Sequence, residues 1–356
     1  MNIPDFTSML MIVVMGVSGT QIQTDYQALK GSGRAEYLAG RFKNAELFLQ
    51  NALAVAEKNA DDDAIAATAA ELGNVYQSED RLPEAEEAYA RALSIVRRSS
   101  RQDALVVILL NLGVTYSLGG RYSQALKTLE EAWKTNQISH DEMLRAQILN
   151  SMGMVYLRNG KTRKAEVLFN QAKAARGIER PEPDLIDAQI LNNLGAVYQR
   201  RHKYQEAEKS YQKAVKITQE QLGPAHPDLA LTFANLGELH TAMGRYVEAA
   251  EDFGHGLLIL EQMNPVPYAR ITRMYQEFSK MYLQNKDQAN AELTLVRAVQ
   301  IGRRNPVPDP NFPDLLDTYA AVLKASGQLQ EAERARVEAR AIRAAFALTV
   351  RVPKSH

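Results

Sequence analysis

The chain has 356 residues, of which 46% are hydrophobic and 24% charged, and its formal net charge at pH 7 is zero. These fractions are those of a globular protein, and they exclude a disordered or collagen-like chain. Without a basic excess to neutralise phosphates, no nucleic-acid partner is expected. The absence of cysteine excludes disulfides, thiolate nucleophiles and thiolate metal ligands.

Residues 1–20 form an apolar N-terminal segment. A run from Met9 to Val17 is followed by the step V-S-G, which resembles the small-residue cleavage site of an export signal. No Lys or Arg precedes the run, and it is shorter than the about 20 residues that span a bilayer. Two interpretations stay open: a weak signal of a periplasmic or secreted protein, or an apolar cap or mis-called start of a cytoplasmic one. No integral membrane span is expected elsewhere.

The rest of the chain repeats itself. Small residues in helical context recur in steps of 40 to 42 residues, and an alanine follows each of them twelve positions later. A fixed period of this length is the signature of a helical repeat array. We call the small position of each unit its packing position; it is occupied by Gly33, Gly73, Gly113, Gly153, Gly195, Gly237, Ser279 and Ala320. The predicted repeats are about 26–59, 66–99, 106–139, 146–179, 188–221, 230–263, 272–305 and 313–346.

Each unit is predicted to be a hairpin of two helices. Large side chains recur three or four residues from the small ones, as at Leu194 and Tyr198, which is the period of a buried helical stripe. Glycines such as Gly120 and Gly160 follow the first helix, where it must end. We therefore expect an all-α fold in which residues 21–350 form a single solenoid, followed by a tail at 351–356.

The motifs of these units resemble a known family. LGNVY at Leu72, LGVTY at Leu112 and LGAVYQRRHKYQEAEKSYQKA at Leu194 are similar to the tetratricopeptide repeat. The usual period of that family is about 34 residues, so the longer step implies longer helices or connections. With the linker LGPAHPDLAL at 222–231, it is similar to the kinesin-light-chain type of the repeat. The resemblance implies an α-solenoid of about eight hairpins, wound as a right-handed superhelix, whose first helices line the concave surface.

Asparagines recur within the expected first helices, although asparagine stabilises a helix less than alanine or leucine does. In one interpretation their amides face the groove and pair with the backbone of an extended peptide. In the other they bridge neighbouring helices inside the stack. The groove interpretation predicts these partner-binding residues: Asn74, Asn111, Asn150, Met154, Arg158, Gln189, Asn192, Asn193, Gln199, Arg200 and Asn235.

Two of these candidates are cationic. Arg158 and Arg200 would give a preference for acidic partner segments through charge-assisted pairs with carboxylates. The alternative is that both arginines are solvated ends of helices.

No motif for catalysis, cofactor binding or metal binding is found. NGKT at 159–162 has Val155 where a phosphate-binding loop needs glycine. The six histidines show no metal-ligand spacing, and no serine lies in G-x-S-x-G. His240 is expected to fill a position that other repeats give to an aromatic residue.

The sequence therefore predicts a non-enzymatic scaffold without cofactors that binds a peptide or helix of a partner protein in a concave groove. The alternative is a self-associating regulatory or assembly factor, so a homo-oligomer stays open.

Overall fold

The computed structural model describes residues 19–99, 101–139, 141–177, 182–263, 266–305 and 309–349. Most of the apolar segment 1–20 and the whole tail 351–356 lie outside these ranges. Within them the chain forms sixteen helices and no strand, which confirms the all-α prediction. None of the helices in these ranges is long and apolar enough to cross a membrane.

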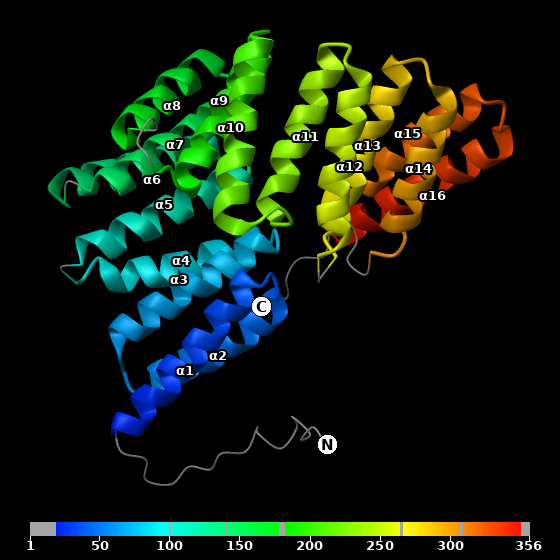
Figure 1. The fold of residues 1–356 in the computed structure, drawn as a ribbon. Coiled ribbons are helices and arrows are strands. Elements are labelled where there is room, and N and C mark those ends of the chain that lie inside the picture. Colours follow the sequence, from blue (N-terminus) through cyan, green and yellow to red (C-terminus); the bar gives the residue numbers. More distant parts are fainter. Residues whose placement is uncertain are drawn as a thin grey trace, which may run out of the picture. The chain divides into compact units, whose positions relative to one another are not determined.

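The sixteen helices form eight hairpins, and three residues join the two helices of each hairpin (Figure 1). So short a connection makes the paired helices neighbours that run in opposite directions. In chain order the hairpins are α1 (Gly19–Leu38) with α2 (Phe42–Lys58), α3 (Asp62–Ser78) with α4 (Leu82–Val96), α5 (Gln102–Leu118) with α6 (Tyr122–Ser139), α7 (Glu142–Arg158) with α8 (Thr162–Arg176), α9 (Leu185–Arg200) with α10 (Tyr204–Leu222), α11 (Pro227–Ala242) with α12 (Tyr246–Glu261), α13 (Tyr268–Gln284) with α14 (Gln288–Gly302), and α15 (Phe312–Ala325) with α16 (Leu329–Thr349).

The helices of the repeat are several turns long. The first helices range from 14 residues in α15 to 20 residues in α1. The turn inside each hairpin needs one residue with positive φ, which is Gly120 (φ 73°) after α5 and Gly160 (φ 72°) after α7. Asp80 and His202 take the same backbone conformation without glycine, at φ 60° and 58°.

The chain divides into two compact units. The first, Met1–Asp141, contains α1 to α6, and the second, Glu142–His356, contains α7 to α16. Within each unit a first helix contacts the next first helix, as α3 contacts α5 and α9 contacts α11. Between described residues, no Cα pair within 8 Å joins one second helix to the next. The first helices therefore form the more closely spaced layer of each unit.

The first six hairpins close on a glycine at the packing position, which Ser279 and Ala320 occupy in the last two. A Cβ added at Gly195 would lie 2.6 Å from Cε1 of Tyr211, and one added at Gly153 would lie 2.6 Å from Cε1 of Phe169. Both rings are fully buried. Glycine is required there because real Cβ atoms do not approach a ring so closely, and the second helix could otherwise not pack on the first. The recurring glycine thus accommodates the large side chain that follows it by sixteen residues.

Candidate functional site

Polar side chains join successive first helices at one repeated register. The residue three positions before the packing position of one repeat meets the residue two positions before that of the next. Asn193 on α9 donates an Nδ2 hydrogen bond to Oδ1 of Asn150 on α7 (2.9 Å), and Asn235 on α11 donates in the same way to Asn192 on α9 (3.0 Å). These asparagines are therefore bound to one another between repeats.

The same register pairs other polar residues elsewhere. In the first unit, Lys30 on α1 lies 3.6 Å from the carboxylate of Glu71 on α3. Near the C-terminus, Gln276 on α13 donates to the hydroxyl of Thr318 on α15 at 3.4 Å. The register is thus a property of the hairpin stack, because an ion pair and an amide–hydroxyl pair occupy the place of the asparagine pairs.

The third repeat shows what happens when this partner is missing. Ala70 stands three positions before the packing position of the second repeat and offers Asn111 no polar atom. Asn111 instead donates to Oδ1 of Asn74 at 3.0 Å, and the same oxygen accepts a 2.6 Å bond from the hydroxyl of Tyr89. We call the whole set the polar ladder: Lys30–Glu71, Asn74–Asn111, Asn150–Asn193, Asn192–Asn235 and Gln276–Thr318.

The ladder amides differ in burial. Asn150 and Asn193 are 9% and 8% exposed, whereas Asn111, Asn192 and Asn235 are half-buried. A side-chain amide has two N–H groups and two carbonyl lone pairs, so one bridging bond leaves it further capacity. Only the half-buried amides present that capacity to a ligand.

Two further predicted groove residues are engaged within the fold. Gln199 accepts a hydrogen bond from the hydroxyl of Tyr211 at 3.0 Å. Arg200 donates from Nη1 to the backbone carbonyl of Leu157 at 2.6 Å, and so satisfies a carbonyl in the last turn of α7.

The remaining predicted groove residues lie on α7 and α9. Met154 is half-buried, whereas Arg158 and Gln189 are exposed. No hydrogen bond or ion pair joins Arg158 to any residue that the structure describes. Both predicted cations are exposed, but Arg200 is engaged with the backbone of α7.

The surface of the second unit also contains charged residues that were not predicted. Glu238 on α11 is exposed, yet burial raises the pKa of its carboxyl group, and the negative charge of Glu277 raises it further. The nearby cations Arg273, Lys280 and Arg200 oppose this shift of the pKa. These charges belong to α9, α11 and α13, which are all first helices.

A signal for these charges was present in the sequence. Glu238 and Lys280 directly follow the packing positions of the sixth and seventh repeats, as Asn74 and Met154 follow those of the second and fourth. The groove prediction used this register in the earlier repeats alone, so it missed the later ones.

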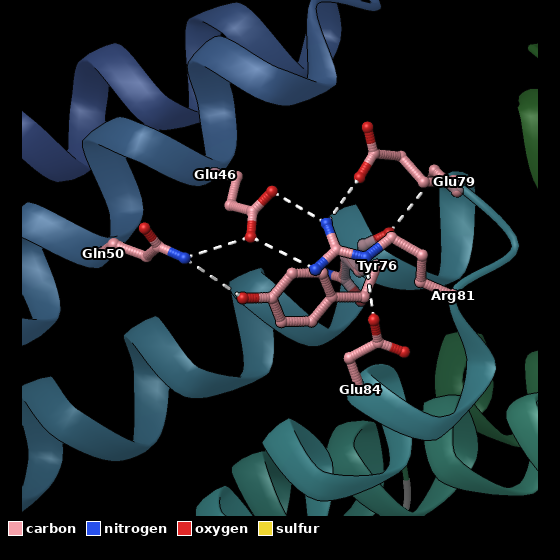
Figure 2. Close-up of polar contacts among 8 residues, drawn as sticks. Glu46, Gln50, Tyr76, Glu79, Arg81 and Glu84 are labelled. Carbon is pink, nitrogen blue, oxygen red and sulfur yellow. Dashed lines mark hydrogen bonds and ion pairs between the residues drawn. The ribbon is translucent and has the colours of Figure 1, made fainter. Parts of the chain in front are cut away.

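A second contact between repeats lies at the turns of several hairpins, and Figure 2 shows the one at Arg81. Arg81, in the turn between α3 and α4, donates to the carboxylate of Glu46 on α2 at 2.8 Å and lies over the ring of Tyr76 at 4.3 Å. Arg121 repeats this arrangement with Glu86 on α4, at 2.6 Å. Because these groups stay partly solvated, each pair contributes at most about 1 kcal/mol, so they add to a stack that apolar packing stabilises.

His240 interrupts this pattern in the sixth repeat, where it replaces the tyrosine. Its Nδ1 lies 2.6 Å from the carboxylate of Asp252 on α12, and its Nε2 lies 3.2 Å from that of Glu208 on α10. Ionised carboxylates only accept hydrogen bonds, so the protonated ring, which donates from both nitrogens, satisfies both contacts. The residue is buried, as expected for this position, but it acts as a charged bridge between two helices. No cluster of His, Asp and Glu in the described ranges could hold a metal ion.

Comparison with known proteins identifies the repeat. The tetratricopeptide repeat family matches the chain at residues 64–137 and 187–262, which confirms the predicted resemblance. No curated protein matches the sequence.

Solved structures show the same fold. BtubC (BKLC) from P. vanneervenii is 23% identical, with a TM-score of 0.54 over 66% of this chain and 93% of that one. A tetratricopeptide repeat protein from Parabacteroides merdae is 17% identical, with a TM-score of 0.51 over 87% and 99%. The Rap conjugation gene regulator of plasmid pLS20, solved with the Phr* peptide, is 15% identical, with a TM-score of 0.64 over 82% and 78%.

These likenesses confirm the α-solenoid of helical hairpins, and the kinesin-light-chain type of the repeat fits the BtubC structure. The right-handed superhelix stays a prediction.

Removal of a ladder amide is expected to destabilise the protein according to its burial. Asn193→Ala leaves the buried amide of Asn150 without its partner and should lower the free energy of unfolding by about 1–3 kcal/mol. Asn235→Ala should lower it by only about 0.5–1.5 kcal/mol, because water can reach half-buried Asn192. Urea unfolding followed by circular dichroism measures both. The exposed control Gln189→Ala should change the free energy of unfolding by less than about 0.5 kcal/mol. Equal losses in all three variants would contradict the assigned amide pairs.

His240 should make stability depend on pH. The hydrogen bond to Asp252 raises the pKa of His240 above its ordinary value of 6.5. The contribution of His240 to stability is therefore complete below about pH 6.5. It is lost as the pH rises through the raised pKa of the folded state. Glu208, Arg245 and Glu248 also face the ring.

The test is an NMR titration of the histidine rings between about pH 5.5 and about pH 9, together with urea unfolding of the wild type and of His240→Gln. The stability difference between the two proteins should shrink as the pH rises. A His240 ring that titrates below 6.5 would contradict the bridge.

Proposed function

Because the chain carries tetratricopeptide repeats, we propose that it is a non-enzymatic scaffold that holds a peptide or a helix of a partner protein against its first helices. The observation that carries the proposal is the surface of the second unit. There, half-buried amides and accessible charges follow consecutive first helices at a fixed register.

The spacing of the helices supports this choice of face. In each unit the first helices contact one another, and the second helices are further apart. A stack that is tighter on one side curves toward that side, so the first helices form its inner face. Solenoids use such inner faces to bind extended partners.

The chemistry of this face suits a polypeptide ligand. Amides such as Asn192 and Asn235 can donate to and accept from a peptide backbone whatever its sequence. The charges of Glu238 and Lys280 would then select the side chains that the peptide presents beside them. Arg158 adds a cation for an acidic residue of the partner, as the sequence predicted.

One of the similar structures supports the class of ligand. The Rap regulator of plasmid pLS20 was solved in complex with a peptide, the Phr* peptide. For the present chain, a peptide ligand is a proposal by analogy with that fold.

Selection from a random peptide library on the immobilised full chain tests the proposal. We expect enrichment of peptides whose affinity Glu238→Lys lowers by about tenfold or more, because the variant reverses a charge on the binding face. The matched control is Glu251→Lys, which reverses an exposed charge on the second helix α12 and should leave affinity unchanged.

Failure to enrich any peptide, or equal losses in both variants, would overturn the proposed face. Light scattering on the same sample addresses the alternative of a self-associating factor. A mass that stays monomeric as concentration rises is expected, and a stable oligomer that enriches no peptide would favour the alternative.

A further inference from the structure

A tyrosine fills the space between the first and second repeats. Tyr76 on α3 packs in a cluster with Leu53, Leu72 and Ala88. Its hydroxyl accepts a hydrogen bond from Nε2 of Gln50 at 3.5 Å (Figure 2). The phenol ring thus has apolar walls and one amide partner at its polar end.

Between the fifth and sixth repeats the corresponding residues surround a pocket of about 250 Å³. Phe233, Lys216 and Gln219 complete its lining. By their distance from the packing positions, Gln212, Val215, Leu236, His240 and Asp252 of this pocket correspond to Gln50, Leu53, Leu72, Tyr76 and Ala88. The pocket therefore keeps a glutamine and two apolar residues at positions that surround the Tyr76 ring, but has no tyrosine between them.

The geometry of His240 keeps this space open. Imidazole is smaller than phenol, and bonds to Asp252 and Glu208 hold the ring at both nitrogens. At the end of the pocket opposite His240, the amide of Gln212 makes the same contact within its helix as the amide of Gln50 does. Gln212 donates to Oε1 of Glu208 at 3.3 Å, as Gln50 donates to Oε1 of Glu46 at 3.0 Å.

We propose that this pocket, among α10, α11 and α12, binds a phenolic ring whose hydroxyl meets the amide of Gln212. Val215, Phe233 and Leu236 supply the apolar walls. A cavity of about 150 Å³ lined by apolar side chains holds benzene, so the pocket has room for phenol. The exposed side chains of Lys216 and Gln219 place its mouth at the protein surface.

The first test titrates the full chain with p-cresol and with toluene, followed by amide chemical shifts in NMR. We expect saturable binding of p-cresol, about threefold tighter than that of toluene, because only p-cresol offers a hydroxyl to the Gln212 amide, which is exposed and otherwise meets water. Gln212→Leu should abolish this preference, whereas Gln171→Leu on the exposed surface of α8 should leave it intact. Wild-type protein that binds neither ligand, or both equally, would overturn the proposal.

A second test fills the pocket. The double variant His240→Tyr with Asp252→Ala recreates the Tyr76–Ala88 pair of the second repeat, and Glu208 keeps Arg245 as a partner at 3.0 Å. It should retain its helical circular dichroism and lose p-cresol binding. Val215→Phe, which narrows the pocket from α10, gives an independent check if the double variant does not fold. Unchanged binding in a folded, filled variant would refute the site.

Competition distinguishes the two sources of a phenol. The capped tripeptides Ac-Ala-Tyr-Ala-NH2 and Ac-Ala-Phe-Ala-NH2 are added to the complex with p-cresol. Displacement by the tyrosine peptide alone indicates a site for a protein side chain, and displacement by neither peptide indicates a site for a free phenol. Equal displacement by both peptides would contradict recognition of the hydroxyl.

Discussion

In the first six hairpins a large side chain of the second helix lies against a glycine of the first, at a distance that leaves no room for a Cβ. At Gly195 that side chain is Tyr211, and the alanines Ala207 and Ala214 beside it are fully buried. The ring against Gly195 and the two buried alanines beside it together restrict the relative placement of the two helices. Hairpins closed in this way resemble one another closely, and so each presents its side chains to the next at the same register.

The polar ladder follows from that register. Apolar packing between repeats tolerates small shifts, but Asn193 meets Asn150 only when the two first helices stand in one alignment. A buried amide without a partner is costly, so the ladder disfavours other alignments of the stack. The half-buried amides of Asn192 and Asn235 serve the same register while they remain accessible to a partner. The row of residues that aligns the stack is therefore the row proposed to meet a partner.

The sequence was sufficient for the hairpins because the step of 40 to 42 residues and the small residues are local patterns. It named the ladder asparagines without their partners, since Asn150 and Asn193 are 43 residues apart and their pairing depends on how two hairpins stack. The pocket beside His240 was missed for a related reason. Its lining comes from three helices, and Asp252 in place of a small residue becomes informative only when the repeats are superposed. Nor does the repeat pattern mark the division after Asp141.

A double-mutant cycle on Gly195 and Tyr211 tests the central contact most directly. In wild-type protein, Gly195→Ala should lower the free energy of unfolding by about 1–3 kcal/mol, because the new methyl group meets a buried ring. In the Tyr211→Ala background the same change should raise it by up to about 1 kcal/mol, since alanine is the better helix former. The account thus predicts that the effect reverses sign. An equal loss of stability in both backgrounds would contradict it.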